Sequence, residues 1–376
     1  MYQINLIFGM EAITPIFSKT DNYKFFRTLN KRVNDYFKEN NIEKTGNWKL
    51  HLKTIILFTV FLAPYFLIIT LNDMPFWAFF LLSIVTGIGM AGIGMNVMHD
   101  GNHGSYSSKS WVNKFMGGSI YILAGNVYNW QVQHNVLHHT YTNIHGHDED
   151  LDAGRIMRFT KEADWKYFHK FQHYYSVFLY GLLTFNWAIT TDFLQMKRYL
   201  KRKLSYGEPQ TATKQWTTLV ITKVIYFAIW IAIPIIVGIS WWQVLIGFLV
   251  MHYTAGVILS IVFQLAHVVE DIAYPTPDEN HEIENTWAIH QLFTTANFAP
   301  KNWLINWYTG GLNHQIEHHI FPHISHVHYG KIAKIVKETA QECNLPYNEF
   351  KTMRAAVYSH FKHLKELGQQ PQLVLA

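Results

Sequence analysis

Two long apolar blocks place the strongest limit on how this chain folds. Residues 54–98 and 216–262 contain one charged side chain each, Asp73 and Lys223. A membrane-spanning helix needs about 20 consecutive apolar residues, so each block has room for two such helices. The blocks therefore predict an all-α integral membrane protein with four transmembrane helices in two hairpins.

The hairpins divide the chain into five parts. A helix at residues 21–39, with an apolar stripe, is expected to lie on the membrane surface. An interfacial amphipathic helix is expected at residues 174–193. The predicted parts are a cytosolic N-terminal segment (1–53), a first hairpin (54–98), a cytosolic and interfacial segment (99–215), a second hairpin (216–262) and a cytosolic C-terminal segment (263–376).

The distribution of basic residues predicts the orientation in the membrane. The two hairpin turns, residues 72–75 and 238–240, contain no Lys or Arg, whereas the terminal and central segments are rich in both. By the positive-inside rule, both termini and the central segment are expected in the cytoplasm. No signal peptide is recognisable at the N-terminus. The net charge of +5 fits this rule, and no nucleic-acid partner is expected because no basic run is interleaved with aromatic residues.

Three histidine clusters follow the apolar blocks, and all are expected on the cytoplasmic side. They are HDGNH at residues 99–103, HNVLHH at 134–139 and NHQIEHH at 313–319. Histidines four apart share one face of a helix, and neutral imidazole is the commonest metal ligand in proteins. The clusters therefore predict one metal site that is shared by segments far apart in the sequence.

The number of histidines predicts two metal ions. One zinc ion takes about four ligands, and three or fewer protein ligands when it is catalytic. A set of nitrogen ligands suits zinc, copper, iron or nickel, so the ligand type does not choose among these metals. The single cysteine, Cys343, excludes an internal disulfide and a cysteine-ligated cluster. The acids near the clusters, Asp100, Glu270 and Glu317, are expected to orient imidazoles.

The remaining histidines have less company in the sequence. Surface or packing roles are expected for His51, His169, His173, His252, His360 and His363. Structural roles, or roles beside the metal ligands, are expected for His145, His147, His281, His290, His323, His326 and His328.

The motifs HDGNH, HNVLHHTYTNIHGHDED and NHQIEHHIFPHISHVHYGKI resemble those of the membrane fatty acid desaturases. The similarity covers roughly residues 80–340, and Gln315 at the start of the third motif is typical of the front-end (Δ5 and Δ6) branch. The resemblance implies a cytosolic helical cap that holds two iron ions. Its implied ligands are His99, His103, His134, His138, His139, His267, His318 and His319, with Gln315 where other branches have a histidine.

The resemblance also implies the reaction. Such an enzyme uses O2 as a co-substrate to place a cis double bond in a fatty acyl chain, such as a linoleoyl chain, carried as acyl-CoA, acyl-ACP or a membrane glycerolipid. Many front-end desaturases carry a fused cytochrome b5 domain with a His-Pro-Gly-Gly motif, which this sequence does not contain. A separate electron donor, such as ferredoxin or cytochrome b5, is therefore expected.

Two other function classes remain open. A histidine-box hydroxylase or ketolase would share the metal site, and only its oxygenated product would distinguish it. A membrane metal transporter would instead place ionisable residues at mid-membrane depth. His252 and Lys223 are the only residues that fit that description.

Overall fold

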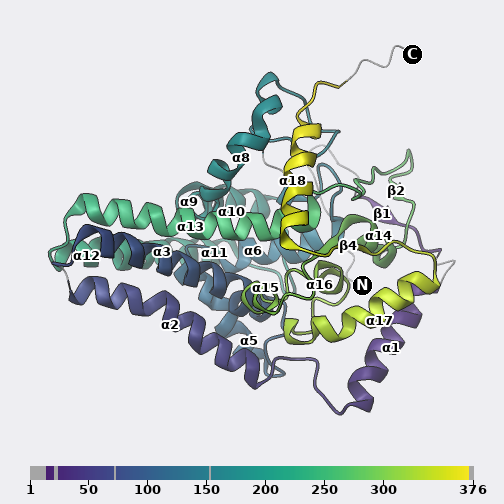
Figure 1. The fold of residues 1–376 in the computed structure, drawn as a ribbon, viewed down its shortest axis with the longest axis horizontal. Helices are drawn as coiled ribbons and strands as arrows, with labels where there is room; N and C mark the ends of the chain where they lie inside the picture. Colours follow the sequence, from purple (N-terminus) through teal and green to yellow (C-terminus); the bar gives the residue numbers. More distant parts are fainter. Residues whose placement is uncertain (1–13, 21–23, 72, 152–153, 372–376) are drawn as a thin grey trace.

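The computed structural model describes residues 14–20, 24–71, 73–151 and 154–371, and α-helices dominate it (Figure 1). Four long helices lie side by side, and each is long and apolar enough to cross a membrane. They are α2 (Trp48–Thr70); α3 (Phe76–Ile93), which continues into η1 (Gly94–Met98) and α4 (His99–Asn102); α11 (Ala212–Phe227), which continues through η7 (Ala228–Ala232) into α12 (Ile233–Ile236); and α13 (Trp241–His267). The predicted helical membrane protein is confirmed.

The ends of these helices differ from the ends of the apolar blocks. The helix α2 begins at Trp48 because the side chain of Asn47 caps it by accepting the backbone N–H of Lys49. The second long helix does not stop at Met98, because the π-helical turn η1 leads directly into α4. This continuation sets His99 at the end of a helix that the packed bundle holds in place.

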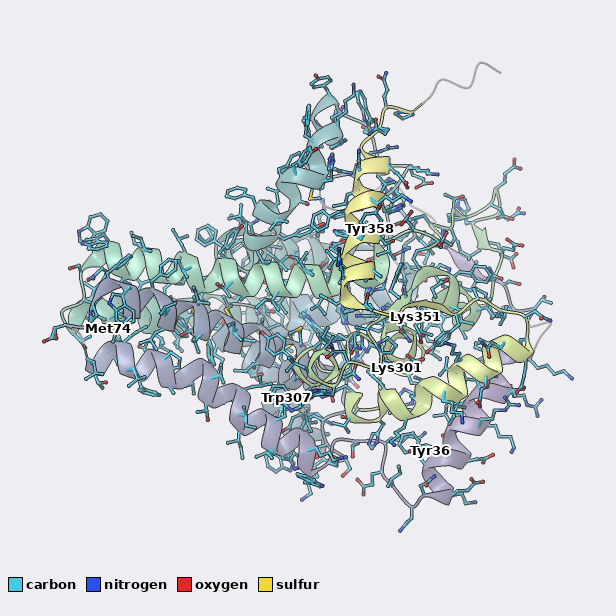
Figure 2. The ribbon with its side chains drawn as sticks, viewed as in Figure 1. Tyr36, Met74, Lys301, Trp307, Lys351 and Tyr358 are labelled. Atoms are coloured by element: carbon cyan, nitrogen blue, oxygen red, sulfur yellow. The ribbon has the colours of Figure 1, made fainter. Side chains whose placement is uncertain are left out.

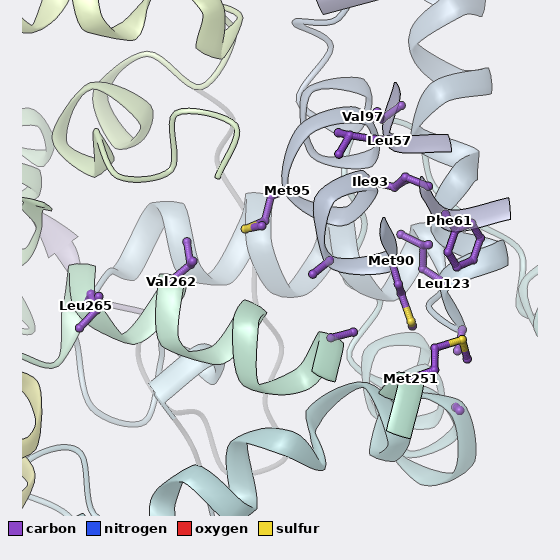
Figure 3. Close-up of a cluster of buried hydrophobic side chains, with 14 of the residues drawn as sticks. Leu57, Phe61, Met90, Ile93, Met95, Val97, Leu123, Met251, Val262 and Leu265 are labelled. Atoms are coloured by element: carbon purple, nitrogen blue, oxygen red, sulfur yellow. The ribbon is translucent and has the colours of Figure 1, made fainter. Parts of the chain in front are cut away.

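Small residues bring α3 close to its neighbours. A Cβ atom at Gly89 would lie 2.6 Å from the backbone of Phe61, and one at Gly87 would lie 2.6 Å from the carbonyl oxygen of Met251. Glycine therefore lets these backbones touch, as in other membrane helix pairs. Figure 3 shows the apolar core around these contacts, where Phe61 of α2 and Met251 of α13 lie on either side of Met90.

The segment between the two apolar blocks is helical but bent. It contains α5 (Ser110–Gly117), η2 (Gly118–Leu123), α6 (Val127–Trp130), η3 (Gln131–His138), α7 (His139–Tyr141), η4 (Glu149–Leu151), η5 (Tyr167–Phe171), α8 (Gln172–Gly181), α9 (Leu183–Asn186), η6 (Trp187–Thr191) and α10 (Asp192–Lys201). Where one interfacial helix was predicted, two helical runs meet at Leu182 and are bent by 54°. The helix α8 consequently points away from the four long helices (Figure 1).

The remaining elements gather at one end of the four helices (Figure 1). They are α1 (Phe25–Glu39), α14 (Trp287–Thr294), α15 (Trp303–Tyr308), α16 (Gln315–Ile320), η8 (His326–His328), α17 (Tyr329–Glu342), α18 (Met353–Leu367) and two parallel strand pairs, β1 (Ile16–Phe17) with β2 (Glu282–Ile283) and β3 (Ala296–Phe298) with β4 (Asn348–Phe350). Figure 2 shows Met74 at the far end of the bundle from Lys351 of this group. We call this group the cap.

The predicted stripe on α1 exists, but it faces other helices of the cap and is not free to face a membrane surface. The stripe consists of Phe25, Leu29, Val33 and Phe37, all buried. It packs against α14 and α17 in one apolar cluster. Residues 21–23, at the start of the predicted helix, lie outside the described residues.

Candidate metal centre

The fold brings the three histidine clusters together where α4 and α13 meet the cap. One group consists of His99, His103, His134 and His318, each of which offers a ligand atom within 4.8 Å of the others. We call this group site A. It combines the end of the second long helix, the π-helix η3 and the cap helix α16. Residues more than two hundred positions apart in the sequence thus face one point.

A second group, site B, lies beside the first. His138, His267 and His319 also place ligand atoms within 4.8 Å of one another. His139 lies at the boundary, with its Nε2 atom 3.2 Å from Nε2 of His134 and 3.0 Å from Nε2 of His318. All the histidines that the sequence indicated as candidate ligands therefore lie together, and each of the two groups could hold a metal ion.

The π-helix η3 explains how one short segment contributes to both sites. In a π-helix the backbone hydrogen bonds join residues five apart, and the N–H of His139 is bonded to the carbonyl oxygen of His134. His134 and His139 therefore turn toward the same side, while His138 turns toward α13. Such insertions in helices are frequent at functional sites.

At site B each imidazole is held by its Nδ1 atom. Nδ1 of His138 lies 3.0 Å from Oδ2 of Asp148, Nδ1 of His319 lies 2.9 Å from Oε1 of Gln291, and Nδ1 of His267 lies 3.4 Å from the carbonyl oxygen of Thr294. The Nε2 atoms of the same three histidines are buried and have no hydrogen-bond partner among the described residues. Buried polar atoms are normally paired, so three converging nitrogen atoms without partners fit a metal ion.

The protonation of the site suits metal binding. Burial lowers the pKa of His103, His134, His139, His318 and His319 well below the usual value for histidine. These imidazoles are therefore neutral and keep a lone pair for a metal. Burial also acts to lower the pKa of His138, but the adjacent carboxylates of Asp148 and Asp150 outweigh it and raise this pKa.

The acidic partners differ in part from those predicted. Glu270 forms an ion pair with Lys362 at the surface, so its predicted role beside the histidines is wrong. Asp100 does face the site, with Oδ1 lying 3.9 Å from Nδ1 of His99. Asp148 and Asp150 were not predicted as partners, although they lie soon after the second cluster in the run HDED at residues 147–150.

His314 and Gln315, which are adjacent in the third cluster, point in different directions. Gln315 is buried, and its side chain lies beside His267. The side chain of His314 is turned toward Glu317, with 3.7 Å between Nδ1 and Oε2. Gln315 rather than His314 therefore lies beside site B.

A cavity of about 770 Å³ reaches the histidines from the interior of the protein. Ligand pockets commonly have about 300–1,000 Å³, so this volume accommodates a sizeable molecule. The apolar part of its wall includes Met90, Leu123 and Leu259, and the polar part includes Gln133, Gln195 and Arg198, while His99, His134 and Gln315 also line it.

Comparison with known proteins agrees with this architecture. The model of the family described as fatty acid desaturase matches residues 75–351. The chain is 36% identical to an sn-1 linoleoyl-lipid 6-desaturase of Arthrospira platensis, over 93% of this chain and 94% of the relative. It is 34% identical to an enzyme of the same name from Synechocystis, over 93% and 97%, and 32% identical to an acyl-lipid (8-3)-desaturase of Physcomitrium patens, over 94% and 73%. The chain is therefore an oxidoreductase that belongs to the fatty acid desaturase family.

Proposed function

We propose that this protein is a front-end acyl desaturase of the Δ6 or Δ5 type that acts on a fatty acyl chain such as linoleoyl. The proposal assigns two iron ions to the histidines, one to site A and one to site B, with His139 between them and Gln315 beside site B. The observation that carries it is the set of three buried, unpartnered Nε2 atoms at site B, each on a ring fixed through Nδ1. Two irons held by these histidines would supply the oxidising chemistry. With O2, two electrons and two protons, one hydrogen would be lost from each of two neighbouring carbons and two water molecules would form.

The protein's own contribution is to position the acyl chain and to exclude bulk water. The apolar wall near Met90, Leu123 and Leu259 suits a hydrocarbon tail. Holding one pair of carbons against the metals turns the oxidation into an intramolecular step, which is the main source of selectivity.

The polar wall supports oxidation near the carboxyl end of the chain. Gln195 donates a hydrogen bond to Gln133 at 2.6 Å, and Gln133 is the neighbour of His134 in sequence. If the ester group of the substrate lies at these amides, the carbons closest to it are also the carbons closest to site A. This arrangement favours a new double bond between the carboxyl group and an existing one.

The membrane arrangement is part of the proposal. Two hairpins, 54–98 and 216–262, would cross the bilayer, and the parts 1–53, 99–215 and 263–376 would place both termini and the metal sites in the cytoplasm. A glycerolipid acyl chain could then enter from the membrane, and a separate donor such as ferredoxin or cytochrome b5 would deliver electrons at the cap. The names of the relatives from Arthrospira and Synechocystis favour a lipid-linked substrate over acyl-CoA or acyl-ACP.

Expression in a host that lacks polyunsaturated lipids tests this function. The cells are fed linoleate, and the fatty acids are analysed by mass spectrometry that locates double bonds. We expect a new cis double bond on the carboxyl side of the existing pair, and about two irons in each purified chain. A hydroxylated or ketone product would assign the protein to another histidine-box reaction, and a chain without iron would overturn the metal assignment.

A further inference from the structure

A lysine is buried in the protein at the start of the first long helix. Lys53 of α2 is 5% exposed, although α2 is apolar enough to cross a membrane. An isolated buried ammonium group costs several kcal/mol, so it needs compensating partners. Its Nζ atom donates hydrogen bonds to Oδ1 of Asn96 at 3.0 Å and to Nε2 of His326 at 2.9 Å. The ring of Trp307, at the junction of α15 and α2 in Figure 2, lies 5.6 Å from the same atom.

The contact with Lys53 fixes the tautomer of His326. Because the ammonium group can only donate, Nε2 of His326 is the acceptor and the ring proton is on Nδ1. This Nδ1 atom lies 2.9 Å from Oδ2 of Asp100. One imidazole thus connects a buried cation to a buried carboxylate.

Asp100 is in turn directed at a histidine of site A. Its Oδ2 atom also accepts a hydrogen bond from Oγ of Ser325 at 2.7 Å, so this oxygen is held by the cap. The other oxygen, Oδ1, lies 3.9 Å from Nδ1 of His99, which is within ion-pair range but too long for a hydrogen bond. Metal-bound histidines usually donate their second N–H to such a carboxylate, which fixes the orientation of the ring.

We propose that Lys53 and His326 are positioning residues for the iron at site A, acting through Asp100 on His99. This inference rests on the proposed function. Without the cation, the carboxylate of Asp100 would be buried and uncompensated, and its orientation toward His99 would no longer be favoured. His326, in the HISHVH run after the third cluster, would thus contribute to metal binding although it is not a ligand.

The same junction has anchors that do not depend on Lys53. The backbone N–H of Ser325 donates to the carbonyl oxygen of Lys44 at 2.8 Å, and Nε2 of His328 lies 3.1 Å from the carbonyl oxygen of Thr45. These contacts keep the segment after the third cluster against the start of α2. A variant at Lys53 is therefore expected to fold.

The chain offers a matched control for the loss of a buried lysine. Lys223 is also 5% exposed, and its Nζ atom lies 2.7 Å from Oδ2 of the buried Asp192. Among the described residues, neither Lys223 nor Asp192 forms a hydrogen bond or an ion pair with a histidine of site A or site B. Lys223→Met therefore removes a similar buried charge without touching the proposed relay.

The test is the retention of iron by purified, iron-loaded protein dialysed against increasing concentrations of a chelator. We expect Lys53→Met to bind one of its two irons about 10- to 100-fold more weakly than the wild type does. It should bind the other iron as tightly as the wild type does. Lys53→Arg, which retains the charge, should recover most of this loss. The double variant Lys53→Met with Asp100→Asn lacks both charges. It should be more stable to heat than Lys53→Met alone, but it should still bind the iron at site A weakly.

The outcomes separate this inference from the proposed function. If the wild type holds two irons while Lys53→Met and Lys223→Met lose iron at the same chelator concentrations, the positioning role is overturned. That result leaves the proposed function standing. Simultaneous loss of both irons from Lys53→Met at wild-type thermal stability would also overturn it, because the relay reaches only site A. A wild type without iron would overturn the function together with the inference.

Discussion

The histidines of site B differ in their hydrogen bonds from buried histidines elsewhere in the molecule. At site B, Nδ1 of each ring is bonded and Nε2 has no partner among the described residues. Farther from the cap, His252 is bonded on both sides, by Thr184 at 3.0 Å and by the hydroxyl of Tyr226 at 2.8 Å. Within the cap, His360 of α18 is also bonded on both sides, to the carbonyl oxygen of Val268 at 2.7 Å and to the hydroxyl of Tyr180 at 2.8 Å.

The difference teaches that burial alone does not mark a metal ligand. All these rings are inaccessible to solvent, and burial lowers the pKa of His319 and of His360 alike. Only an unpaired, converging nitrogen leaves a place for a metal, because a nitrogen already bonded to a hydroxyl has no free lone pair or would have to break that bond. The predictions below test this distinction.

The largest effect is expected at site B. His138→Ala removes an imidazole that no neighbouring side chain replaces, so product formation should fall below about 1% of the wild type, since loss of an outer partner alone costs about 10- to 100-fold. His360→Gln removes a histidine that is equally buried but fully bonded. It should retain both irons and most of the activity, at a stability cost of about 1–3 kcal/mol. Iron content and product yield measured in parallel would refute the distinction if both variants lost iron.

A smaller effect is expected when the partner of His138 is changed. Asp148→Asn keeps the shape of the side chain but removes the charge that holds Nδ1–H of His138. We expect an affinity for the iron at site B about 10- to 100-fold weaker, measured by chelator competition. Asp35→Asn, at an exposed ion pair with Lys31, is the control and should leave iron binding unchanged. An unchanged affinity in Asp148→Asn would mean that the orientation of His138 comes from packing alone.

The sequence predicted four long helices and indicated which histidines come together, because both depend on local patterns. The length of the apolar blocks indicated four long helices, and the spacing of the histidines indicated shared helix faces. The ends of the helices depended on details that hydropathy does not contain. The N-cap residue Asn47 and the π-helical turn at residues 94–98 extended two helices beyond their apolar blocks.

The partners of the histidines could not be read from the sequence, because packing of distant segments supplies them. Gln291 of α14 reaches His319, and the partner of His267 is a backbone carbonyl, that of Thr294, which carries no sequence signal. The stripe on α1 was predicted by its periodicity, but the sequence did not show that its partner is α17. Local patterns therefore identify the candidate residues, while tertiary contacts decide how they are held.

Lowering the pH should reduce the stability that the fully bonded His360 contributes. Burial lowers the pKa of His360 to about 4, partly offset by its hydrogen bond to the carbonyl oxygen of Val268. The unfolded chain, with a pKa of about 6.5, takes up the proton first, so this contribution to stability is lost as pH falls from about 6.5 toward 4. Between pH 7 and 5, the wild type should lose about 2 kcal/mol more stability than His360→Gln. Thermal unfolding in mild detergent at both pH values measures this difference, and equal losses would show that His360 is not held neutral.

The smallest effect is expected at a single hydrogen bond of site A. The hydroxyl of Tyr329 lies 3.2 Å from Nδ1 of His318, so Tyr329→Phe removes the partner of one ring and leaves the ring's packing in place. A net hydrogen bond contributes about 1 kcal/mol, which corresponds to an affinity for iron about fivefold weaker. Tyr128→Phe is the control, because Tyr128 is also buried but donates to the carbonyl oxygen of Leu204, away from the histidines. Chelator titration of both variants should show a weaker affinity for one iron only, and only in Tyr329→Phe, because the hydroxyl of Tyr329 contacts site A alone. A loss of iron affinity as large as that of Asp148→Asn would instead mean that His318 cannot keep its orientation without this bond, and that site A depends on its outer partners as strongly as site B does.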